Sequence, residues 1–150
     1  MKINAAERGR ARRIAMQALY QWHITQNPVH IIDADCHKEN DMTKVDVEYF
    51  TELFHNSLKM VSDLDALFKP FLVNISFVKI DPITLAIMRL SCYELKERMD
   101  VPYRVIINEA LNLAKKYGAA DSHKFINGVL DKVASGVREA EFKAAKAKKK

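Results

Sequence analysis

The stretch DPITLAIMRLSCYELKERM, residues 81–99, decides the fold class. Asp81 can cap the first N–H groups of a helix, and Pro82 stands at the first helical position, where a missing N–H is no disadvantage. Apolar residues then recur at helical spacing as Ile83, Ile87, Leu90 and Leu95. The stretch therefore predicts a helix from Pro82 to about Met99.

Similar spacing continues through most of the chain, and only four glycines and four prolines interrupt it. Further helices are predicted at about residues 7–26, 50–68, 103–117 and 121–133. A short helix over 29–36 with a loop after it, and a helical turn near 75–79, are also expected. Asp121 or Ser122 should cap the last helix, and Gly128 inside that helix predicts close approach of another backbone or of a ligand. The pattern predicts an all-α fold of about seven helices in one domain, 1–150, with flexible basic ends at 1–9 and about 140–150.

The net charge of +5 is unevenly distributed along the chain. Residues 1–16 carry +4 and residues 138–150 carry +4, whereas the part between them carries −3. Clustered positive charge at two ends favours a nucleic-acid partner, although a solubilising tail explains KAAKAKKK equally well. Two cysteines far apart predict no disulfide and a reducing, cytoplasmic location, and the apolar runs are too short for a membrane span.

The sequence lacks the usual motifs of catalysis and of metal binding. The four glycines are isolated, so there is no phosphate-binding loop, and neither Cys-x-x-Cys nor His-Glu-x-x-His occurs. Asp121, Ser122 and His123 are consecutive, so they point in different directions and do not form a triad. We therefore expect no enzyme activity, cofactor, small-molecule substrate or metal.

Two groups of residues remain as a candidate RNA-binding surface. The first contains four arginines and the stripe that follows them: Arg8, Arg10, Arg12, Arg13, Gln17 and Tyr20. The second lies near the start of the last helix: His123, Lys124, Phe125 and Asn127. Arginines bind phosphates and aromatic rings stack on unpaired bases, so the combination suits single-stranded RNA. Cations at a helix start are disfavoured by the helix dipole, which also indicates an external anion. The alternative is a solvated arginine face with Phe125 in the core.

Three segments carry a resemblance to a known family. RRIAMQALYQW (12–22), DVPYRVIINEALNLAKKYG (100–118) and above all ADSHKFINGVLDK (120–132) resemble the NusB family of bacterial transcription antitermination factors, and the likeness extends over nearly the whole chain. Family members often read RRRAR followed by an acid, whereas this chain reads RGRARR at 8–13. Thr84 stands where the family usually has an acidic residue. A NusB-like domain also occurs fused to RNA methyltransferases, but a cofactor loop is missing here.

The resemblance implies two small helical bundles and binding of boxA RNA together with NusE, a protein of the small ribosomal subunit. The transcribing RNA polymerase, with other Nus factors, would then resist termination, chiefly in ribosomal RNA operons. The implied RNA contacts are Lys2, the four arginines, Gln17, Tyr20, Asp121, Lys124, Phe125 and Asn127. The implied NusE contacts are Tyr20, Phe71, Asp81, Thr84 and Arg89. A protein-interaction module that acts in ribosome assembly without reading RNA is the alternative function.

Overall fold

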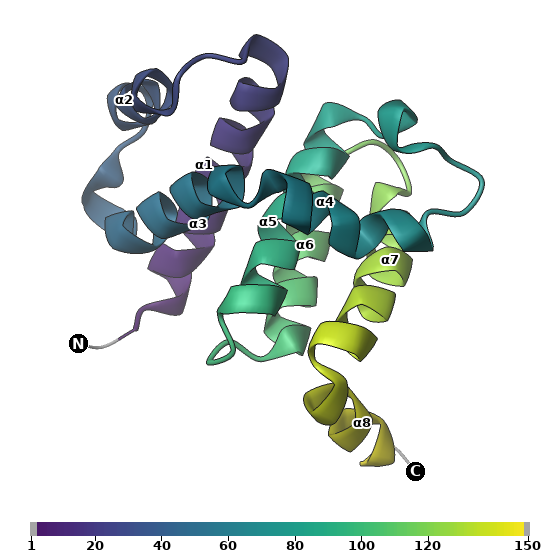
Figure 1. Cartoon of the computed structure of the whole chain (residues 1–150). Coiled ribbons are helices and arrows are strands. Elements are labelled where there is room, and N and C mark those ends of the chain that lie inside the picture. The colour runs from purple at the N-terminus through teal and green to yellow at the C-terminus, as the bar shows by residue number, and fades with distance from the viewer. Residues whose placement is uncertain (1–2, 149–150) are drawn as a thin grey trace.

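The computed structural model describes residues 3–148, and every regular element in this range is helical (Figure 1). This confirms the predicted all-α class. The α-helices are α1 (Ala5–Thr25), α2 (Val29–Glu39), α3 (Val47–Lys59), α4 (Val61–Phe68), α5 (Pro82–Glu97), α6 (Tyr103–Tyr117), α7 (Ser122–Val137) and α8 (Glu139–Ala147). Three 3₁₀ turns accompany them: η1 (Met42–Lys44), η2 (Lys69–Phe71) and η3 (Phe77–Lys79). None of the helices described is both long and apolar enough to cross a membrane.

Helix α5 is the centre of the fold. Asp81 caps it by accepting a hydrogen bond from the Thr84 N–H at 2.9 Å, and Pro82 occupies its first position, as the sequence predicted. Every residue from Thr84 to Leu95 is buried, because α5 packs against α1, α3, α4, α6 and α7. Helices α1 to α3 lie on one side of α5, and α6 and α7 lie on the other (Figure 1). The two predicted bundles therefore share this helix.

The structure corrects the predicted helix over residues 50–68, which is two helices. Met60 leaves the helical conformation, with φ −107° and ψ 15°, so α3 ends at Lys59 and α4 begins at Val61. Helical apolar spacing continues across this break, since Phe54, Leu64 and Phe68 are all buried. Periodicity alone therefore could not show it. The segment 29–44 forms α2 and η1. The break at Met60 and the additional helix α8 bring the described α-helices to eight rather than about seven.

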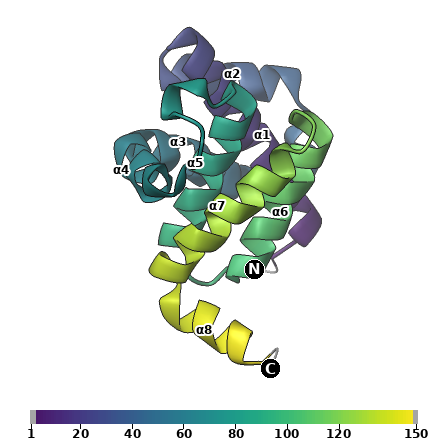
Figure 2. The ribbon, with the colours of Figure 1, turned by 90° about the vertical axis from the view of Figure 1, so that its right-hand side faces the viewer.

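The ends that the sequence predicts to be flexible are helical where the structure describes them. Residues 5–9 belong to α1, and residues 140–147 belong to α8, which continues below α7 (Figure 2). Lys2 and residues 149–150 lie outside the described residues. Gly128 has no close neighbour, because a Cβ built there meets no described atom within 4 Å outside its own helix backbone. The expected close approach of another backbone is therefore absent from this part of the chain, and that of a ligand stays a prediction.

A single buried side chain, Arg138, fixes the start of α8. Its guanidinium donates hydrogen bonds to four backbone carbonyls around the end of α5, at 2.7–3.1 Å, which belong to Glu94, Leu95, Arg98 and Val101. It also pairs with the Glu141 carboxylate at 2.7 Å. The Glu94 and Arg98 carbonyls also accept backbone N–H groups, whereas Arg138 is the donor that satisfies those of Leu95 and Val101.

Candidate nucleic-acid interface

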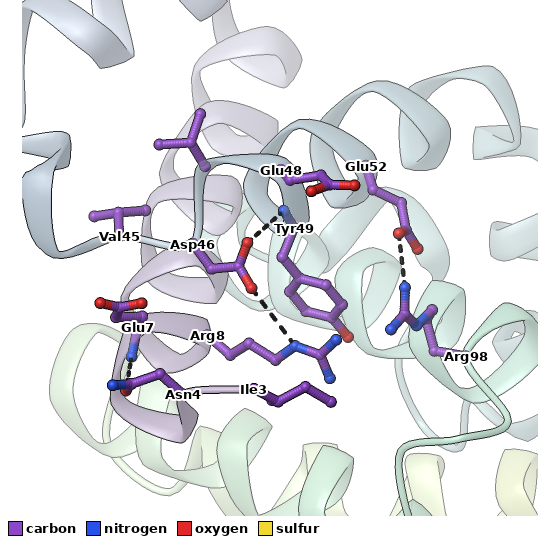
Figure 3. Close-up of a pocket in the computed structure, with 11 residues that line it drawn as sticks. Ile3, Asn4, Glu7, Arg8, Val45, Asp46, Glu48, Tyr49, Glu52 and Arg98 are labelled. Carbon is purple, nitrogen blue, oxygen red and sulfur yellow. Dashed lines mark hydrogen bonds and ion pairs between the residues drawn. The ribbon is translucent and has the colours of Figure 1, made fainter. Parts of the chain in front are cut away.

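The first arginine of α1, Arg8, is held against α3. Asn4 caps α1 by accepting from the Glu7 N–H at 3.0 Å. One turn later the Arg8 guanidinium lies 4.2 Å from the ring centroid of Tyr49 and its Nε lies 3.8 Å from the Asp46 carboxylate (Figure 3). Arg8 is therefore already partnered by an aromatic face and a negative charge, and only part of its guanidinium is open to solvent.

These contacts form one wall of a hollow of about 390 Å³ that the sequence did not reveal. Across it, Arg98 pairs with Glu52 at 2.8 Å, and its guanidinium lies 4.9 Å from the Tyr49 ring centroid (Figure 3). The prediction began the helix at Phe50 and so missed the Asp46 cap, which accepts from the Tyr49 N–H at 3.0 Å. An aspartate three residues before Tyr49, in DVEY, was the available signal.

Arg12 is a correction, because it is a core residue. Arg12 is only 4% exposed, and its guanidinium donates two parallel hydrogen bonds to the Glu94 carboxylate, at 2.8 and 2.9 Å. The Tyr49 hydroxyl donates to the same carboxylate. Burial raises the pKa of Tyr49, and the Glu94 charge raises it further, so the hydroxyl stays a neutral donor. This guanidinium is not available to a phosphate in the folded protein.

The remaining residues of α1 keep the predicted stripe. Arg10 is exposed, although one of its terminal nitrogens donates to the Lys44 carbonyl at 2.8 Å. Arg13, Gln17 and Tyr20 are half-buried. Among residues 3–148 these three have no hydrogen-bond partner for their side chains, and no carboxylate lies within 4.0 Å of the Arg13 guanidinium. They offer a cation, an amide and an aromatic ring at helical spacing.

At the start of α7 the predicted cap is wrong. Asp121 adopts the left-handed conformation, with φ 65°, and neither it nor Ser122 makes a side-chain capping bond. Asp121 instead lies 3.5 Å from the Lys124 ammonium, and both are well exposed. Phe125 is half-buried and lines a hollow of about 370 Å³ beside Val73 and Asp81. Asn127 lines a different hollow, so it does not share a face with Phe125.

Two of the residues implied to face NusE are also interior. Thr84 is 2% exposed and donates its hydroxyl to the Asp81 carboxylate at 2.6 Å. Arg89 is 6% exposed and makes two hydrogen bonds with Asp65, both 2.9 Å long. Both side chains are therefore engaged inside the protein and expose little surface to a partner. Asp81 is exposed and Phe71 is half-buried, so both remain accessible.

The two groups of candidate residues stand on different helices. In Figure 1, α1 lies on one side of α5 and α7 on the other, and Figure 2 shows α6 and α7 in front of α1.

Within the described chain, no cluster of His, Cys, Asp and Glu could hold a metal ion. Both cysteines are buried, and burial raises the pKa of Cys36 to about 11, so this thiol stays protonated.

Known proteins resemble the chain in sequence and in structure. The model of the NusB family matches residues 9–135. The transcription antitermination protein NusB of Saccharophagus degradans is 60% identical over 144 residues, which cover 96% of each chain. That of Teredinibacter turnerae is 59% identical over 146 residues, which cover 97% of this chain and 99% of the relative.

Among solved structures, NusB of T. maritima superposes with a TM-score of 0.79 at 28% identity, covering 95% of this chain and 99% of that one. The antitermination factor NusB in a complex with NusE and double-stranded RNA superposes with a TM-score of 0.76 at 22% identity, covering 87% of this chain and 97% of that one. At that identity the second likeness concerns the fold.

Proposed function

The chain belongs to the NusB family, and from this we propose that it is an RNA-binding transcription antitermination factor that acts with NusE. It binds boxA RNA of nascent transcripts, notably those of ribosomal RNA operons, so that RNA polymerase with other Nus factors resists termination. The observation that carries the proposal is the 59–60% identity to antitermination proteins over nearly their whole length. In this role the protein binds and positions, and it catalyses no reaction.

The residues that best fit the RNA contact are the accessible ones. Arg13 and Arg10 supply phosphate contacts, Gln17 offers hydrogen bonds to a base edge, and Tyr20 offers a ring for stacking. Lys124 contributes once RNA phosphate replaces the exposed Asp121 carboxylate, and the exposed edge of Phe125 adds a second aromatic surface. Arg12 supports this surface from beneath, because its pairing with Glu94 fixes α1 on α5.

The segment between α4 and α5 fits the NusE contact. Val73 is 63% exposed and Val78 is 85% exposed, next to the half-buried Phe71. Large apolar side chains this exposed and this close in sequence are typical of a protein contact. The Asp81 carboxylate lies at the edge of the same hollow as Val73, where it adds a charged rim.

The decisive experiment is a titration of labelled boxA RNA against a scrambled RNA of equal length and composition, with and without purified NusE, at two salt concentrations. We expect tighter binding to boxA, and a further gain when NusE is present. If about three phosphates are neutralised, log affinity should fall with log salt at a slope near −2 for a single strand. Equal affinity for both RNAs in every condition would refute the proposal.

A specific observation favours a second function, a protein-interaction module that acts in ribosome assembly through NusE. Arg8 and Arg12 have internal partners, which leaves fewer free cations at the start of α1 than the sequence indicated. This function predicts that Val78→Asp abolishes NusE binding, whereas Arg13→Gln changes no RNA affinity. A loss of RNA affinity in Arg13→Gln would decide against it.

A further inference from the structure

A polar groove lies between the outer faces of α6 and α7, and α8 closes one end of it. Its hollow has a volume of about 290 Å³. The residues that line it are Tyr103, Arg104, Ile107, Asn108, Asn127, Asp131 and Lys146. A second hollow, of about 430 Å³, adjoins it between the start of α6 and α8, and there Arg104 lies together with Lys148. We call the four side chains Arg104, Asn108, Asn127 and Lys146, with Lys148 at the rim, the α8 groove.

The cations of the α8 groove have no carboxylate partner among the described residues. Arg104, Lys146 and Lys148 are exposed, and no carboxylate of residues 3–148 lies within 4.0 Å of any of them. Lys143 on the same helix differs, because Glu139 neutralises it at 2.7 Å. Arg104 also stands in the first turn of α6, where the helix dipole disfavours a cation. Three unpaired positive charges around one groove favour an anionic ligand.

Helix α8 holds these lysines in place rather than leaving them on a free tail. The Phe142 ring packs on Tyr103 with centroids 5.5 Å apart, and the Glu141 carboxylate accepts from the Tyr103 N–H at 2.8 Å. Arg138 fixes the start of the helix through its backbone contacts. The Lys146 ammonium lies 5.1 Å from the Phe142 ring centroid. A preorganised cation loses less conformational freedom on binding than a free lysine does.

The polar side chains of the groove indicate which anion fits. The Asn108 and Asn127 amides are exposed, and no described residue forms a hydrogen bond with either side chain. Each amide can donate and accept, as recognition of base edges and 2′-hydroxyls requires. Asp131 is the one acid that lines the hollow, and it can accept a hydrogen bond from a 2′-hydroxyl or an amino group. RNA carries a 2′-hydroxyl and a base edge beside every phosphate, so its repeating unit matches the cations and amides of the groove.

The groove is also continuous with the start of α7. Lys124 and Asn127 are three residues apart on that helix and therefore neighbours on its surface. A strand that contacts Lys124 can continue past Asn127 and reach Arg104 and Lys146. The matched family model ends at residue 135, so the lysines of α8 lie beyond the region that the family model describes.

We propose that the α8 groove binds the backbone of RNA that flanks the boxA element on one side. Arg104, Lys146 and Lys148 contact phosphates there, and the two asparagines contact sugar or base edges. The proposal rests on the function proposed above, since it extends the path of the same RNA. The groove makes RNA affinity depend on the length of the flanking RNA, without a preference for the sequence of that flank.

The test compares the wild type with Arg104→Gln/Lys146→Gln in fluorescence anisotropy. The RNAs are boxA alone, boxA with ten uridines on its 5′ side, boxA with ten uridines on its 3′ side, and the same three with a scrambled core. The control Lys38→Gln/Lys59→Gln removes the same charge from exposed sites on α2 and α3. All substituted side chains are exposed, so melting temperatures should agree.

We expect one of the two flanks to increase wild-type affinity, and the groove variant to lose that gain. Two missing phosphate contacts correspond to roughly a 25-fold loss at about 0.1 M salt and a salt slope shallower by about 1.4. Affinity for unflanked boxA should stay within about twofold, and the control variant should behave as the wild type does. The scrambled core should show the same flank effect at lower overall affinity.

Several outcomes would overturn the groove. If the groove variant lost equal affinity for flanked and unflanked RNA, the two cations would act only through the general positive potential of the protein. If it lost no affinity for any RNA, the groove would not bind RNA. If RNA affinity were unchanged while NusE affinity fell, the ligand would be an acidic protein surface. Failure of the proposed function looks different, because the wild type would then bind boxA and scrambled cores equally, whatever the flank does.

Discussion

Replacing Arg12 by methionine separates a structural arginine from an RNA-binding one. Arg12→Met keeps the length of the side chain but leaves the Glu94 carboxylate, 1% exposed, with only the Tyr49 hydroxyl among its former side-chain partners. Two charge-assisted hydrogen bonds are lost and a buried charge is left uncompensated. We expect the free energy of unfolding to fall by roughly 3–5 kcal/mol. For a chain of this size the melting temperature should fall by roughly 6–20 °C.

The assay is urea unfolding followed by circular dichroism, with RNA titrations at a temperature where each variant is folded. A second substitution, Glu94→Gln, removes the unpaired charge and keeps an acceptor for the Tyr49 hydroxyl. In the Arg12→Met background it should recover roughly 1–3 kcal/mol, so the double-mutant cycle should show strong coupling. The folded double variant should bind RNA within about twofold of the wild type.

Arg13→Met is the matched control, because Arg13 is half-buried and has no partner among the described residues. Its stability should change by about 0.5 kcal/mol or less, while its RNA affinity should fall. The reasoning fails if Arg12→Met loses less than about 1 kcal/mol of stability and yet loses about tenfold in RNA affinity. That result would mean that the Arg12–Glu94 pair opens to admit a phosphate.

Three further predictions follow from the packing. Arg138→Ala leaves the Leu95 and Val101 carbonyls without their donor, so stability should fall by about 3 kcal/mol or more, and loss of α8 helicity should accompany it; an unchanged urea midpoint would contradict this. Burial and the neighbouring carboxylate raise the folded-state pKa of Tyr49 above its unfolded value of about 10, so its contribution to stability is fully present below about pH 10 and is lost progressively as the pH rises from there toward the folded-state pKa. Stability between pH 9 and 11 should therefore fall more steeply in the wild type than in Tyr49→Phe, and parallel curves would refute this. Gly128→Ala fills open space on an exposed helix face and should stabilise by about 0.5–1 kcal/mol; a weaker affinity for NusE or RNA in this variant alone would show that a ligand approaches there.

Most of the fold could be predicted because helical spacing and end signals agree along much of the chain. Asp81, Pro82 and Gly118 mark helix ends where the structure has them. The break at Met60 could not be predicted, since the apolar seam continues through it and no glycine or proline marks it. Helix α8 could not be predicted either, because its order depends on contacts between Arg138 and carbonyls about forty residues away.

The candidate site could be predicted as a region but not residue by residue. A run of arginines indicates positive charge, whereas which of them reaches solvent depends on where Glu94, Tyr49 and Asp46 lie in the folded chain. Arg12 and Arg13 are adjacent in sequence, and the helix turns one into the core and the other toward solvent. Such pairings join residues far apart in sequence, and periodicity carries no information about them.

The shared helix α5 has a consequence for how the molecule comes apart. Two bundles joined by a linker could unfold one at a time. Here both bundles pack on α5, so unfolding of one bundle exposes a buried face of the helix on which the other bundle packs. We expect one cooperative transition, in which the amides of Thr84–Leu95 exchange with solvent only through global opening. A partner that binds either bundle would then slow the hydrogen exchange of the core amides in both bundles equally.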